Sequence, residues 1–78
     1  MSTLIGQDRN GQLVEVGDIV LVIDQEIPIE LAVILDFQYP FTDPIVLKFA
    51  DGSEVHRQSA EIEKVSNEKA VLWKLENL

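Results

Sequence analysis

The sequence predicts a small, mostly β domain that ends in a helix. A chain of 78 residues buries only about two thirds of its unfolded surface, so it forms one core and one domain over 1–78. Short apolar runs rich in Val and Ile alternate with turn signals between residues 8 and 65, which is typical of strands. From 66 to 78 the apolar residues change to helical spacing, which predicts a C-terminal helix packed on the β part.

The opening stretch "DRNGQLVEVGDIVLVID" contains two turns and two strands. Asp8–Gly11 is expected to form a tight turn, because Asn and Gly tolerate positive φ and the Asp side chain can bond the backbone ahead of it. Leu13–Val16 is then expected to start the fold, and Gly17–Asp18 to turn the chain again. Ile19–Ile23 is a strand with apolar residues on both faces, so both faces need cover.

The middle of the chain alternates loops and strands. Asp24–Glu30 is expected to be a loop because Pro28 interrupts the strand pattern. The two prolines of Gln38–Pro44 predict an exposed loop of fixed shape. The further strands are expected over Leu31–Phe37, Ile45–Phe49 and Ser53–Arg57.

The hairpin around Asp51 and Gly52 has a predicted register. A two-residue turn would place Phe49 opposite Glu54 and mix charge with core. A three-residue loop with a left-handed Gly52 pairs Leu47 with Val55 and Lys48 with Glu54 instead, so we expect the three-residue loop.

The C-terminal part begins with a helical turn at Ser59–Glu61 and a short strand at Ile62–Val65 that completes the sheet. Ser66 is expected to cap the terminal helix. Val71, Leu72, Leu75 and Leu78 recur along one side of that helix. The alternative is a further strand in which Val71, Trp73 and Leu75 share a face.

Composition limits the classes of function. Fourteen Asp and Glu against six Lys and Arg give a net charge of −8, which opposes binding to nucleic acid or to an anionic membrane. No Lys or Arg occurs between Asn10 and Leu47. The chain has no Cys, no apolar run long enough for a membrane span and no basic flank of a signal peptide, so a cytoplasmic protein is expected.

The order of these signals resembles the SH3-like small barrel family, which includes Tudor and KOW domains. The resemblance rests on "VEVGDIV", a long loop, two long strands, "KFADGSEV" and a helical turn before "IEKV", and it covers residues 8–65. It implies a five-stranded, strongly bent sheet nearly closed into a barrel, used mostly for binding. The glycine-containing loop that KOW domains carry after the first strand is missing. The opening "DRNGQLVEVGDIV" is also similar to YopX-like phage proteins, which implies a phage or mobile-element origin; the matching positions are Asp8, Asn10, Gly11, Gly17, Asp18 and Val20.

The sequence offers no pattern for catalysis. His56, the only histidine, lies mid-strand and is expected opposite Val46 rather than as a general base. Glu61–Glu63 and Asp24–Glu26 lack the ligand spacing of a calcium loop, and no glycine-rich phosphate cradle occurs. We therefore expect a protein that is not an enzyme and that takes no cofactor or metal.

Two features remain as candidate binding surfaces. In the first, Tyr39 and Phe41 present their rings beside an acidic field and receive a cationic side chain of a basic protein partner; in the alternative, both rings pack down and anchor their loop. The carboxylates of this candidate site are Asp24, Glu26, Glu30, Asp36 and Asp43. The expected function is a protein-protein interaction module; the alternative is an acidic inhibitor that imitates nucleic acid in the cleft of a nucleic-acid-binding protein.

The second feature is a surplus of apolar residues. It consists of the outer face of Ile19, Leu21 and Ile23 together with Val71, Leu72, Trp73 and Leu75. Either the terminal helix folds back over this face in a monomer, or the same surfaces meet another copy in a homodimer.

Overall fold

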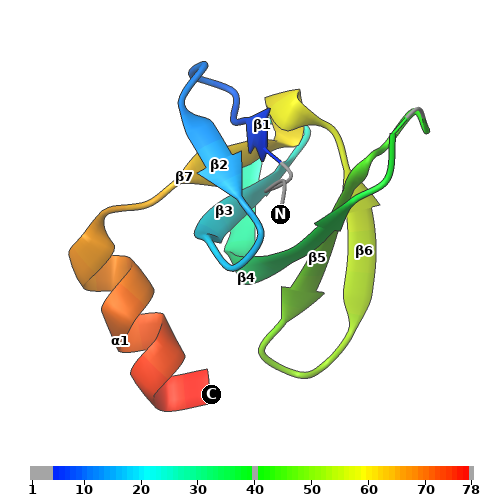
Figure 1. Cartoon of the computed structure of the whole chain (residues 1–78). Helices are drawn as coiled ribbons and strands as arrows, with labels where there is room; N and C mark the ends of the chain where they lie inside the picture. Colours follow the sequence, from blue (N-terminus) through cyan, green and yellow to red (C-terminus); the bar gives the residue numbers. More distant parts are fainter. Residues whose placement is uncertain (1–4, 40, 78) are drawn as a thin grey trace.

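The computed structural model describes residues 5–39 and 41–77 (Figure 1). Seven strands, one 3₁₀ turn and one helix follow one another in this part of the chain. In chain order they are β1 (Ile5–Gln7), β2 (Leu13–Glu15), β3 (Ile19–Asp24), β4 (Ile27–Phe37), β5 (Ile45–Phe49), β6 (Glu54–Arg57), η1 (Ser59–Glu61), β7 (Ile62–Lys64) and α1 (Asn67–Asn77).

Five of the strands form one antiparallel sheet in the order β6-β5-β4-β3-β7. Strands β3 to β6 pair in succession, and the chain then passes through η1 so that β7 pairs with β3 at the opposite edge. The expectation of a mostly β chain with a five-stranded sheet and a C-terminal helix is confirmed. The helical turn expected at 59–61 and the strand expected from Ile62 are present as η1 and β7.

The β5–β6 hairpin has the predicted register. Leu47 pairs with Val55 and Lys48 pairs with Glu54. The loop between the strands closes through a hydrogen bond from the backbone N–H of Phe49 to the Ser53 carbonyl, 2.9 Å long. Gly52 has a φ of 92°, the left-handed conformation that this loop needs. The three-residue loop is therefore confirmed.

The β3–β4 hairpin corrects the prediction of a loop over Asp24–Glu30. Asp24 pairs with Ile27, so only Gln25 and Glu26 form the turn. Both have positive φ, 51° and 66°, as in the two-residue turns that match the twist of a hairpin. Pro28 is tolerated in β4 because the pairing shifts there by one residue and β5 does not extend alongside it.

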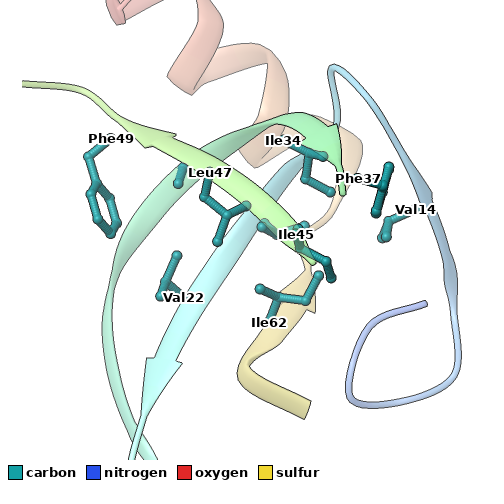
Figure 2. Packing of buried hydrophobic residues seen from close by; sticks show 10 residues of the cluster. Val14, Val22, Ile34, Phe37, Ile45, Leu47, Phe49 and Ile62 are labelled. Atoms are coloured by element: carbon teal, nitrogen blue, oxygen red, sulfur yellow. The ribbon is translucent and has the colours of Figure 1, made fainter. Parts of the chain in front are cut away.

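The core lies between the sheet and the short β1–β2 ribbon. Figure 2 shows it running from Phe49 at one end of β5 to Val14 and Phe37 at the other. Its buried members are Val14, Val20, Val22, Ala32, Ile34, Phe37, Ile45, Leu47, Phe49 and Ile62. Strands β2, β3, β4, β5 and β7 all contribute. The apolar runs from which the sequence predicts strands therefore supply the core.

Strand β1 was not predicted. It pairs with β2, with Gly6 opposite Val14, and the two form a separate sheet. A Cβ at position 6 would lie 2.6 Å from Cε1 of Phe37, so only glycine leaves room for this ring. Glycine is depleted in strands, and this explains why the pattern of the sequence does not reveal β1.

The terminal segment is a helix, and the alternative of a further strand is wrong. Ser66 caps it as expected: its Oγ accepts a hydrogen bond from the backbone N–H of Lys69, 3.3 Å long. The expectation for its apolar side is wrong for Val71 and Leu75, and Leu78 lies outside the described residues. Trp73 is the buried residue of α1, whereas Val71 and Leu75 are 55% and 76% exposed. They lie two residues from Trp73, about 200° around the helix, so burying the larger indole turns them toward solvent.

Candidate functional site

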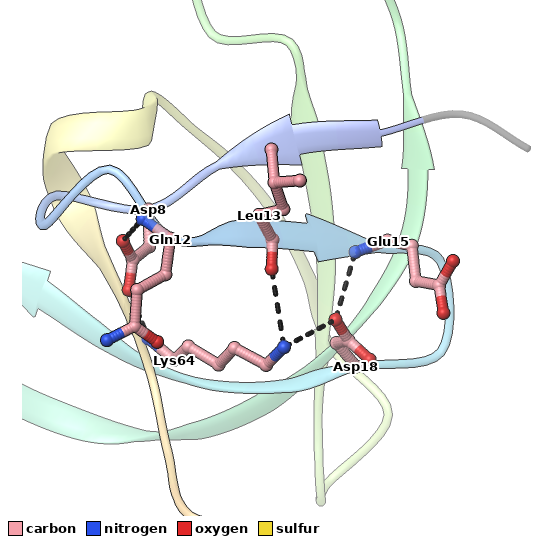
Figure 3. Close-up of polar contacts among 6 residues, drawn as sticks. All are labelled: Asp8, Gln12, Leu13, Glu15, Asp18 and Lys64. Atoms are coloured by element: carbon pink, nitrogen blue, oxygen red, sulfur yellow. Dashed lines mark hydrogen bonds and ion pairs between the residues drawn. The ribbon is translucent and has the colours of Figure 1, made fainter.

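Asp8 holds the first turn in place. Its side chain is buried, and Oδ1 accepts a hydrogen bond from the backbone N–H of Gln12, 2.8 Å long (Figure 3). The same oxygen accepts the backbone N–H of Asn10, 2.9 Å long. Oδ2 accepts a third from the backbone N–H of Lys64 in β7, 2.8 Å long. The turn at 8–11 is therefore confirmed. The bond to Lys64 joins positions far apart in the chain and has no local signal in the sequence.

The side chain of Lys64 contacts β2 and the second turn. Its Nζ donates a hydrogen bond to the Leu13 carbonyl at 3.3 Å and lies 3.9 Å from Oδ2 of Asp18 (Figure 3). The same Asp18 oxygen accepts the backbone N–H of Glu15 across the second turn. These contacts join the two turns of the opening stretch to β7, so the cluster has an architectural role.

The β3–β4 hairpin carries three of the five candidate carboxylates. Asp24 ends β3, Glu26 occupies the turn and Glu30 lies on β4, and all three are exposed. Glu26 pairs with Arg9 of the first turn at 3.0 Å, where its own side chain remains 84% exposed. Arg9 is thereby the cation that lies against this group.

The same hairpin exposes two large apolar side chains. Ile27 is 65% exposed and Ile29 is 48% exposed. The sequence does not predict them as site residues, because Pro28 favours a loop over Asp24–Glu30. The signal that could have revealed them is the sequence Ile27-Pro28-Ile29-Glu30, in which branched apolar residues alternate with other types as in a half-exposed strand.

Asp36 and Asp43 lie elsewhere. Asp36 is near the far end of β4, and its Oδ1 accepts the backbone N–H of Phe37. Asp43 lies in the loop after β4. Asp36 follows Glu30 by six positions, about 20 Å along β4. The structure therefore divides the candidate carboxylates into two groups and does not gather them on one face.

Tyr39 and Phe41 are exposed, so the interpretation that both rings pack down under their loop is wrong. Tyr39 is 57% exposed and Phe41 67%. The ring of Tyr39 stacks on that of Phe37, with planes 2° apart and centroids 6.2 Å apart. Phe41 lines a shallow hollow with Asp43 and His56, a hollow to which Tyr39 does not contribute. The two rings thus face different surroundings, and they do not form one aromatic cage.

The remaining polar groups show no catalytic arrangement. His56 is exposed and pairs with Val46 across the β5–β6 hairpin, as expected. In residues 5–39 and 41–77, no cluster of three or more His, Asp or Glu side chains is arranged to hold a metal ion. Hydrogen bonds from the Ser53 hydroxyl and then from its backbone N–H lower the pKa of Asp51 below its ordinary value. Asp51 closes the β5–β6 loop through these bonds.

Of the two groups of candidate residues, the hairpin group has the features of a binding surface. It combines exposed apolar and acidic side chains on a paired, regular segment. Over the described ranges, no helix combines the length and the apolar character that crossing a membrane requires. No family model, curated protein or solved structure matches the chain.

Proposed function

We propose that this protein is a non-catalytic interaction module that binds a basic segment of a partner protein on the β3–β4 hairpin. The observation that carries the proposal is the composition of that hairpin. Asp24, Glu26 and Glu30 lie on the same hairpin as the exposed side chains of Ile27 and Ile29. Protein interfaces combine apolar side chains with polar and charged ones in this way.

The two kinds of side chain have different roles in this proposal. The isoleucines supply the free energy of association through burial. The carboxylates accelerate encounter with a positively charged partner and select against acidic ones. The ion pair of Arg9 with Glu26 is exposed and is worth about 0–1 kcal/mol, so a cation of the partner can replace Arg9 at little cost.

We further propose that the sheet closes into an SH3-like small barrel. Support comes from the succession of β3 to β6, from the 3₁₀ turn between β6 and β7, and from the return of β7 to β3. The order of the strands and of the 3₁₀ turn agrees with the sequence resemblance, although the long loop of that resemblance is a two-residue turn in this chain. Barrels of this family mostly bind other molecules, which agrees with a binding role. The phage-type origin implied by the opening stretch stays a prediction.

The test compares two variants of equal charge. In D24N/E26Q/E30Q the hairpin loses its carboxylates; in the control E15Q/E54Q/E68Q three exposed carboxylates elsewhere are removed. Tagged wild-type chain is used to capture partners from cells, and each recovered protein is retested with both variants at several salt concentrations. We expect the hairpin variant to lose the partner and the control to retain it. Equal capture by both variants would contradict the proposal.

A competition experiment distinguishes the two proposed functions of this chain, an interaction module and an inhibitor that imitates nucleic acid. Duplex DNA is added to the complex of this chain with the captured protein. A simple interaction module keeps its partner, because the partner's nucleic-acid site is not involved. An inhibitor that imitates nucleic acid is displaced as the DNA concentration rises.

A further inference from the structure

The second surface that the structure leaves open lies between α1 and the sheet. A groove of about 360 Å³ separates them. Leu21 and Leu31 form its sheet side, and Leu72 and Trp73 form its helix side. Trp73 is buried, but Leu72 remains 52% exposed beside it. Trp73 is thus the buried side chain of the described part of the helix, and apolar surface next to it is uncovered.

The charges along this groove are arranged symmetrically on the helix. Lys69 and Glu76 both line the groove, and they lie two helical turns apart on the same side of α1. Leu72 lies between them at the spacings of three and four residues that place side chains on one stripe. The midpoint between Lys69 and Glu76 falls between Leu72 and Trp73.

This arrangement is complementary to itself. If a second α1 runs antiparallel to the first about a two-fold axis near Leu72, Lys69 of each copy faces Glu76 of the other. A two-fold interface uses the same patch on both copies, and each contact then occurs twice. The two leucines at the axis meet one another, and Leu75, which is 76% exposed, lies next to them.

We infer that a second copy of this chain covers the groove, in a two-fold dimer with antiparallel α1 helices. Burial of the exposed leucines drives association. The pairs of Lys69 with Glu76 fix the direction of the helices. The groove carries one cation and one anion, so it does not favour the basic segment proposed for the hairpin, and the dimer does not depend on that proposal.

The first test measures mass in solution. Sedimentation equilibrium over concentrations from micromolar to millimolar is expected to show a reversible dimer for the wild type. L72D places a carboxylate at the axis and should be monomeric over the same range. L13D is the control, because Leu13 is a similarly exposed leucine on β2, 61% exposed. A wild type that stays monomeric to millimolar concentration would overturn the inference, as would equal weakening by L13D.

The second test reverses the charges. K69E and E76K each place like charges opposite one another across the axis, so each should weaken the dimer at least about tenfold. The double variant K69E/E76K restores opposite charges and should regain wild-type affinity, with circular dichroism used to check that all variants are folded. Failure of the double variant to recover would overturn the antiparallel arrangement. The hairpin variant D24N/E26Q/E30Q should dimerise normally, so the two proposals can fail separately.

Discussion

The two hairpins of the sheet differ in how their turns are made. The β5–β6 turn places a glycine, Gly52, at its left-handed position, with φ of 92°. The β3–β4 turn adopts positive φ at two residues with side chains, Gln25 and Glu26. A non-glycine residue at positive φ costs about 1–2 kcal/mol. The β3–β4 turn is therefore held by the pairing of its strands, whereas the β5–β6 turn is favoured by its own sequence.

The hairpins also differ in what they bury. Strand β5 contributes Ile45, Leu47 and Phe49 to the core. The start of β4 contributes nothing comparable, since Ile27 and Ile29 are largely exposed. Strand β5 is therefore buried along its length to Phe49, whereas the β3–β4 hairpin contributes to the core only up to Val22 and from Ala32 on, and its tip extends beyond the core. The exposed side chains at the tip of the β3–β4 hairpin are accessible to another molecule.

The largest expected effect tests this difference in burial. Leu47 is fully buried, so L47A should lower the free energy of unfolding by about 2–5 kcal/mol. That is a large part of the roughly 4–12 kcal/mol expected for a chain of this length. I29A removes a half-exposed side chain on the other hairpin and should change stability by only about 0.5 kcal/mol. Urea unfolding measures both. Similar losses from the two variants would show that β4 is anchored near Ile29.

The contrast between the hairpins also marks the limit of what the sequence predicts. At Leu47 and Lys48 the register followed from keeping charge away from core, together with an Asp-Gly turn signal, and it is confirmed. At Gln25 and Glu26 no residue favours positive φ, and Pro28 disfavours a strand. The pairing with β3 overrides both tendencies. Such a tertiary effect is not contained in any local pattern.

A second pair of variants tests the source of the turn conformation. G52A forces alanine into the left-handed region, so it should lower the free energy of unfolding by about 1–2 kcal/mol. Q25G relieves the same strain on the other hairpin but increases the freedom of the unfolded chain, so it should raise stability by at most about 1 kcal/mol. Thermal unfolding detects both, because 1 kcal/mol shifts Tm by roughly 4–8 °C in a domain of this size. Changes of the same sign would contradict the comparison.

The candidate site was predicted only in part for a related reason. The acidic character of Asp24, Glu26 and Glu30 is visible in the sequence, and the structure does place them on one hairpin. The sequence could not show how far Asp24 and Glu26 lie from Asp36 and Asp43, because that depends on the two-residue turn and on β4 being eleven residues long. Nor could it show which side of α1 faces the sheet. The number of apolar residues favoured Val71 and Leu75, but the single larger side chain of Trp73 determines the orientation.

The smallest expected effect concerns the carboxylate that closes the β5–β6 turn. Asp51 Oδ1 accepts hydrogen bonds from the Ser53 hydroxyl and backbone N–H, 2.6 and 2.8 Å long, which lower its pKa from the ordinary value of 3.8. A pKa that is lower in the folded state contributes stability above the unfolded value and loses it as the pH falls through the folded value. D51N should therefore be slightly less stable than wild type at neutral pH, and the difference should disappear in acid below the lowered pKa. D24N, which removes the same charge from the β3–β4 hairpin, is the control. Urea unfolding as a function of pH would contradict this assignment if the D51N difference stayed constant into acid, because the turn would then not depend on the ionised carboxylate.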